Sequence, residues 1–264
     1  MLYGVVFQSV VPIRKEPFER SEMVTQVLFG ETFMIIEEHK DWLRVVLTYD
    51  SYEGWVDRKS SIVLDQEQFN LLSLKGISMV SSRLFSAKAQ ECDYPIRLCP
   101  GSTIYNYDET TGSFNMVGRH YKTFNVPFDN PFSSSYESIK ELSKSFVNAP
   151  YLWGGRTPYG VDCSGLVQVI YKMIGLVIPR DASQQVLLGQ TVEFLNQYKV
   201  GDLAFFDDEE GDIVHVGIVL DNNSIIHSSG FVRIDKLDQQ GIFSATSKRY
   251  SHRLRVVKRL ITND

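Results

Sequence analysis

Short runs rich in β-branched and aromatic residues dominate the first quarter of the chain. Residues 22–28, 32–36 and 42–46 form three such runs, and turn-forming residues at 29–31 and 39–41 separate them. A fourth run, 54–57, begins at a glycine. Closely spaced short strands of this kind predict a small β-barrel over residues 1–64.

A weaker pattern of the same kind continues over residues 65–130. Residues 66–74 predict a short helix, and Pro100-Gly101 predicts a turn. Short strands are predicted at 77–80, 94–98, 103–105 and 114–117. We expect this region to form a second small β-barrel, a divergent repeat of the first.

A different pattern follows a linker at 125–135, which is rich in proline, asparagine and serine. Ile139, Leu142 and Phe146 lie at helical spacing, and Pro150 ends that helix. These features predict a separate C-terminal domain over residues 131–264.

A second helical pattern begins at Cys163, because apolar residues recur at positions 166, 170, 173, 174 and 177. Gly175 is a candidate helix end. Cys163 is thereby placed at or near a helix N-terminus, where free amides and the helix dipole favour negative charge. We expect this position to lower the pKa of the thiol and to make Cys163 a candidate nucleophile.

Two histidines downstream lie on strand-like segments, His215 within 212–219 and His227 within 224–229. Asn222-Asn223 suits a hairpin turn that brings them together. Strand alternation places His215 opposite Val214 and Val216, so it faces a polar cleft while those valines fill the core. Cys163, His215 and His227 then suit the roles of nucleophile, base and orienting residue. Zinc binding by the same three residues is the alternative reading.

Composition narrows the classes of function. The 264 residues include 27 Lys and Arg against 32 Asp and Glu, a net charge of −5. That charge argues against a nucleic-acid binder that relies on overall positive charge. No apolar run approaches the roughly 20 residues that a membrane helix needs. The odd cysteine count of 3 argues against a disulfide scaffold, so Cys92 and Cys99 are expected to be ordinary thiols.

Four motifs carry a family resemblance: Tyr-Leu-Trp-Gly-Gly at 151–155, Asp-Cys-Ser-Gly at 162–165, Val-Gly-Asp-Leu at 200–203 and His-Val-Gly-Ile at 215–218. Together they resemble the NlpC/P60 family of papain-like cell-wall endopeptidases. The resemblance implies an α+β fold in which helices pack on an antiparallel sheet. It also implies that Cys163 is the nucleophile, His215 the base, His227 the third polar residue, and that the Tyr151 hydroxyl helps to hold the oxyanion.

The N-terminal region, with Asp41-Trp42-Leu43 and Gly54-Trp55-Val56, resembles a bacterial SH3-type domain, so the fold implied is a peptidase domain preceded by two small SH3-like barrels. Together with residues 179–185, it is similar to a subgroup that cleaves after γ-D-Glu in murein peptides with a free N-terminal L-Ala. A glutamate that the subgroup places before Thr25 is replaced by Val24, and Glu22, on the same face by alternation, is its candidate substitute. The resemblance implies these substrate-binding residues: Tyr52, Asp162, Ser164, Arg180, Asp181, Ser183 and Glu22.

The expected function is a cysteine endopeptidase that recycles murein peptides, with no cofactor, metal, nucleic acid or membrane partner. Arg180 is expected to pair with the D-Glu α-carboxylate and Asp162 with the L-Ala ammonium. The chain shows no secretory signal, so a cytoplasmic location is expected if Met1 is the natural start. Three alternatives stay open: an exported enzyme acting on intact wall, a non-catalytic wall-binding module, and an acyl transferase that uses the same residues.

Overall fold

The computed structural model describes residues 1–74, 76–83, 85–124 and 136–261. The chain divides into two compact units, residues 1–131 and 132–264, and each is described by itself below. The predicted linker at 125–135 lies outside the described residues. No helix of the described chain is long and apolar enough to cross a lipid bilayer.

The first unit begins with a seven-stranded antiparallel sheet in the order β3-β2-β6-β5-β4-β1-β7. Alternate residues of these strands are buried; for example Leu43, Val45 and Leu47 of β5 point into one hydrophobic cluster. All four predicted strands are present. The strands are β1 Leu2–Val6, β2 Val10–Arg14, β3 Met23–Leu28, β4 Thr32–His39, β5 Trp42–Leu47, β6 Glu53–Asp57 and β7 Ser61–Leu64, with a 3₁₀ turn, η1, at Arg58–Ser60.

The middle segment forms two small sheets. One sheet has the order β10-β9-β13-β12 and the other pairs β11 with β8. The predicted helix, α1, spans Gln66–Ser73 and begins at a capping box built by Asp65 and Gln68. The strands are β8 Ile77–Met79, β9 Phe85–Ala89, β10 Ile96–Leu98, β11 Thr103–Tyr105, β12 Ser113–Met116 and β13 Arg119–Thr123.

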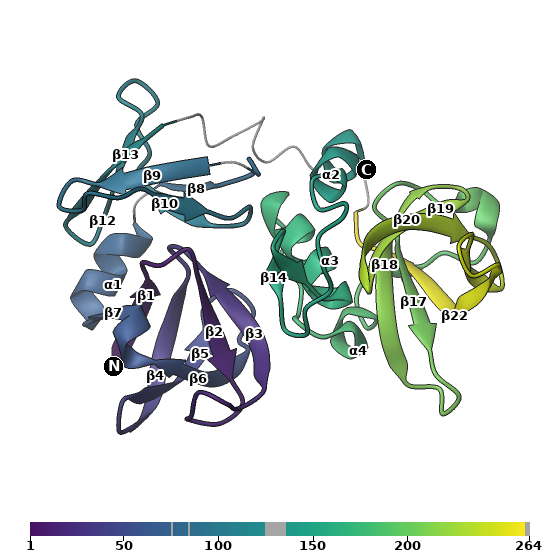
Figure 1. Cartoon of the computed structure of the whole chain (residues 1–264), viewed down its shortest axis with the longest axis horizontal. Coiled ribbons are helices and arrows are strands. Elements are labelled where there is room, and N and C mark those ends of the chain that lie inside the picture. The colour runs from purple at the N-terminus through teal and green to yellow at the C-terminus, as the bar shows by residue number, and fades with distance from the viewer. Residues whose placement is uncertain (75, 84, 125–135, 262–264) are drawn as a thin grey trace. The chain divides into compact units, whose positions relative to one another are not determined.

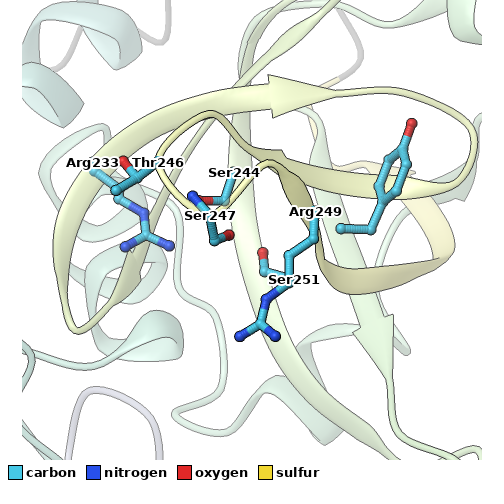
Figure 2. A pocket seen from close by; sticks show the side chains of 7 residues that line it. Arg233, Ser244, Thr246, Ser247, Arg249 and Ser251 are labelled. Carbon is cyan, nitrogen blue, oxygen red and sulfur yellow. The ribbon is translucent and has the colours of Figure 1, made fainter.

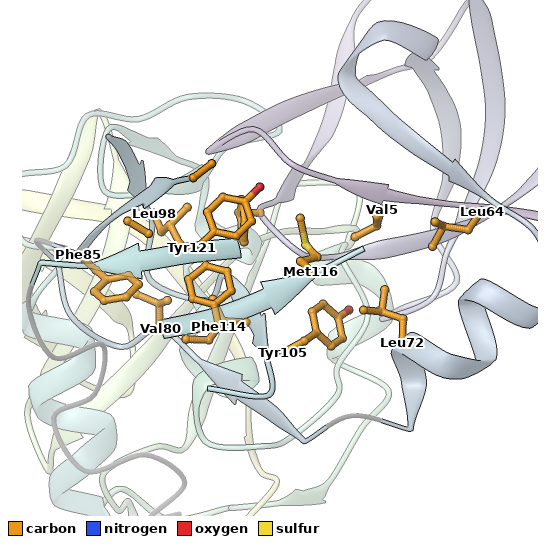
Figure 3. Close-up of a cluster of buried hydrophobic side chains, with 14 residues drawn as sticks. Val5, Leu64, Leu72, Val80, Phe85, Leu98, Tyr105, Phe114, Met116 and Tyr121 are labelled. Atoms are coloured by element: carbon orange, nitrogen blue, oxygen red, sulfur yellow. The ribbon is translucent and has the colours of Figure 1, made fainter. Parts of the chain in front are cut away.

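A shared hydrophobic core joins the middle segment to the first sheet (Figure 3). Phe29 lies in this core with its ring edge-on to Phe114 and Tyr121, and those two rings stack 4.7 Å apart. Val5 and Leu64 of the first sheet belong to the same cluster. The described residues of the middle segment, up to residue 124, therefore bury apolar side chains together with residues of the first sheet, within one unit.

The second unit packs helices against a strongly curved antiparallel sheet (Figure 1). Its strand order is β16-β22-β17-β18-β19-β20-β21, and β22 also pairs with β21, so β17 to β22 close into a barrel. The helices are α2 Tyr136–Lys144, α3 Cys163–Met173 and α4 Ala182–Gln185, with a 3₁₀ turn, η2, at Leu195–Gln197. The strands are β14 Arg156–Thr157, β15 Gly160–Val161, β16 Gln190–Thr191, β17 Leu203–Asp207, β18 Ile213–Asp221, β19 Ser224–Ser229, β20 Phe231–Leu237, β21 Gly241–Ser244 and β22 Arg249–Arg259.

Both faces of the central strands are covered. On the inner face of the barrel, Ala204, Phe206 and Val219 belong to one buried cluster. On the outer face, α3 packs against β18 and β19, and all eleven of its residues are buried. Double coverage explains why β17 is a continuous apolar run in sequence rather than an alternating one.

Candidate active site

Cys163 is the first residue of α3, as the sequence predicts. Asp162 caps this helix, because its carboxylate accepts a hydrogen bond from the Gly165 backbone N–H at 2.7 Å. The helix ends at Met173, and Gly175 has the positive φ of 83° that suits a C-terminal cap.

Backbone pairing ties the segment before Cys163 to the barrel. Pro150 bridges Phe231 at the start of β20, and the Tyr151 N–H donates to the Gly230 carbonyl at 3.0 Å. The Ser228 hydroxyl of β19 donates to the Val161 carbonyl at 2.7 Å. Cys163 and the strands that carry the two histidines are thereby held in one fixed arrangement.

The glycines of the two motifs around Cys163 are required by close packing. A Cβ added at Gly165 lies 2.2 Å from the Gly155 carbonyl oxygen, and one added at Gly155 lies 2.4 Å from the Gly160 carbonyl oxygen. Both contacts are with backbone, which cannot move aside cheaply. The start of α3 therefore packs directly on the loop that precedes it.

The thiol of Cys163 is buried, and its environment opposes ionisation. Burial and the nearby Asp162 charge raise its pKa to about 11, although the backbone N–H groups of Val216 and Ser164 hydrogen-bond to the sulfur and act in the opposite direction. The expected lowering of the thiol pKa is wrong, because desolvation outweighs the helix N-terminus. The hydrogen bond to Val216 places the sulfur beside the residue that follows His215.

The two predicted histidines meet across the β18–β19 hairpin. The Nε2 atom of His215 lies 2.9 Å from Nδ1 of His227, and Nε2 of His227 lies 3.2 Å from Oδ2 of Asp235 on β20. Arg233 donates from Nε to the same Asp235 oxygen at 2.8 Å. A chain of side chains thus runs from His215 through His227 to an ionised carboxylate, whose pKa the hydrogen bond from His227 lowers.

His215 does not face an open cleft. It is 5% exposed, whereas Val214 is 53% exposed, so the prediction that Val214 fills the core is wrong. The sheet closes into a barrel. His215 of β18 lies opposite Phe206 of β17 in the strand register, and Phe206 belongs to the buried cluster on the inner face of the barrel. Burial therefore lowers the pKa of His215 well below its usual value, so that the base is neutral at pH 7.

Sequence reasoning missed two residues of this site. Asp235 completes the histidine chain, and His252 of β22 stacks on His215 with ring centroids 4.1 Å apart. His252 reaches His215 only because β22 closes the barrel. Asp235 lies two residues beyond Arg233, the register partner of His227. Neither relationship leaves a local signal in sequence.

Asp162 and Arg180 form a buried ion pair. Nη2 of Arg180 lies 2.6 Å from Oδ2 of Asp162, and Nη1 lies 3.0 Å from Oδ1. Nη1 also donates to the Ser164 hydroxyl at 2.9 Å, and the Gly154 N–H donates to Asp162 at 2.8 Å. The two groups expected to bind opposite charges of the substrate are therefore paired with each other at the start of α3.

The remaining candidates of the second unit also lie near this helix start. Burial and the charges of Cys163 and Asp162 raise the pKa of Tyr151 to about 12, so its hydroxyl is a proton donor at neutral pH. Asp181 precedes α4, and Ser183 is exposed on it. Gln185 of the same helix donates to the Ser164 carbonyl at 3.1 Å, which ties α4 to the nucleophile helix.

Tyr52 and Glu22 belong to the first unit. Tyr52 packs against the cluster that includes Val45 and Val56. Glu22 is exposed and lies 3.5 Å from the Lys15 ammonium. A register shift opposite Val24 interrupts the alternation between β2 and β3, so the argument that placed Glu22 and Val24 on one face fails. The roles of Tyr52 and Glu22 in substrate binding stay predictions.

Other sequence features have structural roles. Asp202 of the 200–203 motif receives two hydrogen bonds from Arg259, at 2.8 and 2.7 Å. Asp207, the first residue of an acidic run, is buried and pairs with Arg253 at 2.8 Å. All three cysteines of the described chain are free thiols.

A polar pocket of about 390 Å³ opens among residues of β20, β21, β22 and the turn between β21 and β22 (Figure 2). Arg233 lines it and connects it to Asp235, and Ser251 lines it next to His252. Five hydroxyl residues and two arginines give it a basic, hydrogen-bonding character. The full lining is Arg233, Ser244, Thr246, Ser247, Arg249, Tyr250 and Ser251.

Comparison with known proteins agrees with this geometry. Residues 148–251 match the NlpC/P60 family, and residues 13–60 match the bacterial dipeptidyl-peptidase Sh3 domain. Dipeptidyl-peptidase 6 of Lysinibacillus sphaericus is 28% identical over 90% of this chain and 92% of its own length. Gamma-D-glutamyl-L-lysine dipeptidyl-peptidase of Bacillus subtilis (strain 168) is 29% identical over 77% of this chain and 71% of its own.

A crystal structure of an NlpC/P60 family protein from Bacillus cereus ATCC 10987 shares the fold. Its TM-score is 0.81 at 18% identity, over 98% of this chain and all of the other. The helix-on-antiparallel-sheet fold expected of the C-terminal domain is confirmed, whereas one SH3 domain is matched rather than two. The chain therefore carries an NlpC/P60 domain preceded by a bacterial SH3 domain of the dipeptidyl-peptidase type.

Proposed function

We propose that the protein is a cysteine endopeptidase that hydrolyses the bond between γ-D-Glu and the following L-diamino acid of murein peptides. The observation that carries the proposal is the Cys163 thiol at the start of α3, beside β18, whose His215 is hydrogen-bonded through His227 to Asp235. The name of the Bacillus subtilis relative, gamma-D-glutamyl-L-lysine dipeptidyl-peptidase, supports the choice of bond.

The positions of the protons on His215 and His227 decide which ring nitrogen of His215 can act as the base. An ionised Asp235 only accepts hydrogen bonds, so Nε2 of His227 carries its proton and Nδ1 of His227 is an acceptor. His215 must then donate from Nε2, which leaves its Nδ1 lone pair available as a base. The carboxylate thus selects the tautomer of a histidine that it does not touch.

The reaction follows from this tautomer. His215 takes the Cys163 proton as the sulfur attacks the carbonyl carbon, because neither group is charged at rest. The imidazolium then protonates the leaving amine, and a thioester remains on Cys163. Water attacks the thioester with His215 again as base, which releases the acid product and restores the thiol. The Tyr151 hydroxyl is proposed to donate a hydrogen bond to the oxyanion.

Charge recognition is proposed at the start of α3. The D-Glu α-carboxylate binds on the Arg180 side, with Ser164, Asp181 and Ser183, and the L-Ala ammonium binds on the Asp162 side. Because these two residues form one ion pair, the ammonium and the carboxylate each satisfy one member of it. Tyr52 and Glu22 are proposed as further substrate-binding residues.

The specificity test compares three substrates: L-Ala-γ-D-Glu-L-Lys, its diaminopimelate equivalent and the N-acetylated tripeptide. Release of L-Ala-γ-D-Glu from the free peptides, with at least tenfold slower release from the acetylated one, supports the proposal. Equal rates contradict the free-amine requirement, and release from intact sacculi favours a wall-degrading enzyme. A new amide product in place of the free acid identifies a transferase.

A location in the cytoplasm, where free murein peptides are recycled, is part of the same proposal. Fractionation of cells with an antibody against the protein tests it. Recovery with the soluble cytoplasmic fraction is the expected result, and recovery from the medium or the wall contradicts it.

A further inference from the structure

Three histidines converge at the end of the barrel, and the proposed mechanism uses only two of them. His215, His227 and His252 each offer a ring nitrogen, and these atoms all lie within 4.8 Å of one another. They come from β18, β19 and β22, and each is held by its strand or by a ring contact. Neutral imidazole is a preferred ligand of zinc-type cations, and three of them with one open position make a common zinc site.

The surroundings of the three rings suit a divalent metal ion. His227 is also bonded through its second nitrogen to Asp235, the carboxylate–histidine pairing that orients metal ligands. The positive charge of Arg233 is balanced locally, because its Nε donates to Asp235.

We infer that a zinc-type divalent cation binds to His215, His227 and His252 and switches the enzyme off. The inference rests on the proposed function, because it concerns regulation of the same site. The hydrogen bond between Nε2 of His215 and Nδ1 of His227 marks the place of entry, since these two nitrogens lie 2.9 Å apart.

Inhibition follows from the tautomer of His215. A cation that binds to Nε2 of His215 needs the proton on that atom to move to Nδ1, which frees the Nε2 lone pair for the cation. No proton is lost from the ring, and no bond to Cys163 is needed. His215 then has no lone pair for the thiol proton, and the attack on the peptide cannot start. The metal ion thus favours the His215 tautomer with its proton on Nδ1, whereas Asp235, acting through His227, favours the tautomer with its proton on Nε2.

Direct binding is measured on the Cys163→Ser protein, which removes the thiol as a competing ligand. Chelator-treated protein is titrated with zinc chloride in a calorimeter, and one zinc ion per chain is expected. His252→Gln in the same background raises the dissociation constant at least tenfold, whereas His120→Gln, a change in the first unit, leaves it unchanged. No zinc binding, or equal binding by the His252→Gln protein, overturns the inference.

Two further measurements keep the outcomes distinct. Cobalt in place of zinc gives the visible absorption of a four-coordinate site, and its loss in the His252→Gln protein, with the circular dichroism unchanged, excludes misfolding as the cause. In the wild-type protein, zinc abolishes tripeptide hydrolysis and chelator restores it. Binding without any hydrolysis in chelator refutes the proposed function alone, and hydrolysis that zinc does not affect refutes the inference alone.

Discussion

The Nε2 atom of His215 lies 2.9 Å from Nδ1 of His227, and this contact transmits the influence of Asp235 to the base. His227 is fully buried and cannot exchange its partners for water. Its two nitrogens therefore have opposite roles, one as donor to Asp235 and one as acceptor from His215. The proposed reaction and the proposed metal effect both depend on these three residues.

The first prediction concerns Asp235. Replacing it with Ala removes the acceptor that fixes the tautomer of His227, so kcat falls roughly 10²-fold, within the range of general-base catalysis, while KM changes little. Asp235→Asn keeps one oxygen acceptor and recovers part of this loss. The ¹⁵N chemical shifts of the His215 ring report the tautomer directly.

Asp238→Asn is the matched control for that prediction, since Asp238 follows the same strand but bonds to Tyr250 at the surface. It is expected to keep the wild-type kcat. Equal kcat values for Asp235→Ala and wild type, or unchanged ring shifts, contradict the tautomer mechanism.

The second prediction concerns the Tyr151 hydroxyl. Tyr151→Phe removes one donor from the proposed oxyanion site, so kcat falls by about 10² with the ring packing retained. Tyr159→Phe, on an exposed tyrosine of the same loop, is the control and leaves kcat unchanged. Steady-state hydrolysis of the tripeptide separates the two, and identical rates refute the oxyanion role.

The third prediction concerns the buried ion pair. Arg180→Ala leaves the Asp162 carboxylate buried without its charge partner, so the free energy of unfolding of the second unit falls by about 3–5 kcal/mol. Arg44→Ala breaks exposed pairs with Glu37 and Glu53, and it changes the free energy of unfolding of the first unit by less than about 1 kcal/mol. Urea unfolding measures both, and a loss as small as that of Arg44→Ala contradicts the structural role.

The fourth prediction is a loss of stability in mild acid. His215, His227 and His252 all have folded-state pKa values below the unfolded value of 6.5, and that of His252 falls to about 4. Between pH 6.5 and 4 the unfolded chain binds more protons, so stability decreases as the pH falls. Each histidine contributes a slope of up to about 1.4 kcal/mol per pH unit.

Unfolding curves of the His252→Gln protein test this directly. Its free energy of unfolding is expected to depend less steeply on pH below 6.5 than that of wild type. The difference in slope corresponds to the one proton that His252 of the unfolded wild-type chain binds. His39→Gln, in the first unit, is expected to keep the wild-type slope. A stability that rises from pH 6.5 to pH 5 would be incompatible with three buried neutral histidines.

Local sequence patterns predicted what depends on local structure. The helix start at Cys163 follows from the apolar spacing after it, and the hairpin between His215 and His227 follows from two apolar runs around Asn222-Asn223. The seven-stranded first sheet was partly predicted for the same reason, since its strands carry β-branched and aromatic residues.

Features that depend on distant pairing were missed. Closure of the barrel by β22 brings His252 onto His215, and the register of β19 with β20 brings Asp235 to His227. Strand β9, Phe-Ser-Ala-Lys-Ala, has weak intrinsic strand preference and forms through pairing with β10 and β13. The shift opposite Val24 and the buried state of the thiol are likewise set by packing that sequence spacing does not record.

The most direct test of the central claim is hydrolysis of L-Ala-γ-D-Glu-L-Lys by the wild-type and Cys163→Ala proteins, with the products identified by mass spectrometry. Circular dichroism confirms that both are folded. Wild type is expected to release L-Ala-γ-D-Glu and free lysine, and Cys163→Ala to release neither. Hydrolysis at the wild-type rate by Cys163→Ala, or none by the folded wild type, would contradict the assignment of Cys163 as the nucleophile of a γ-D-glutamyl peptidase.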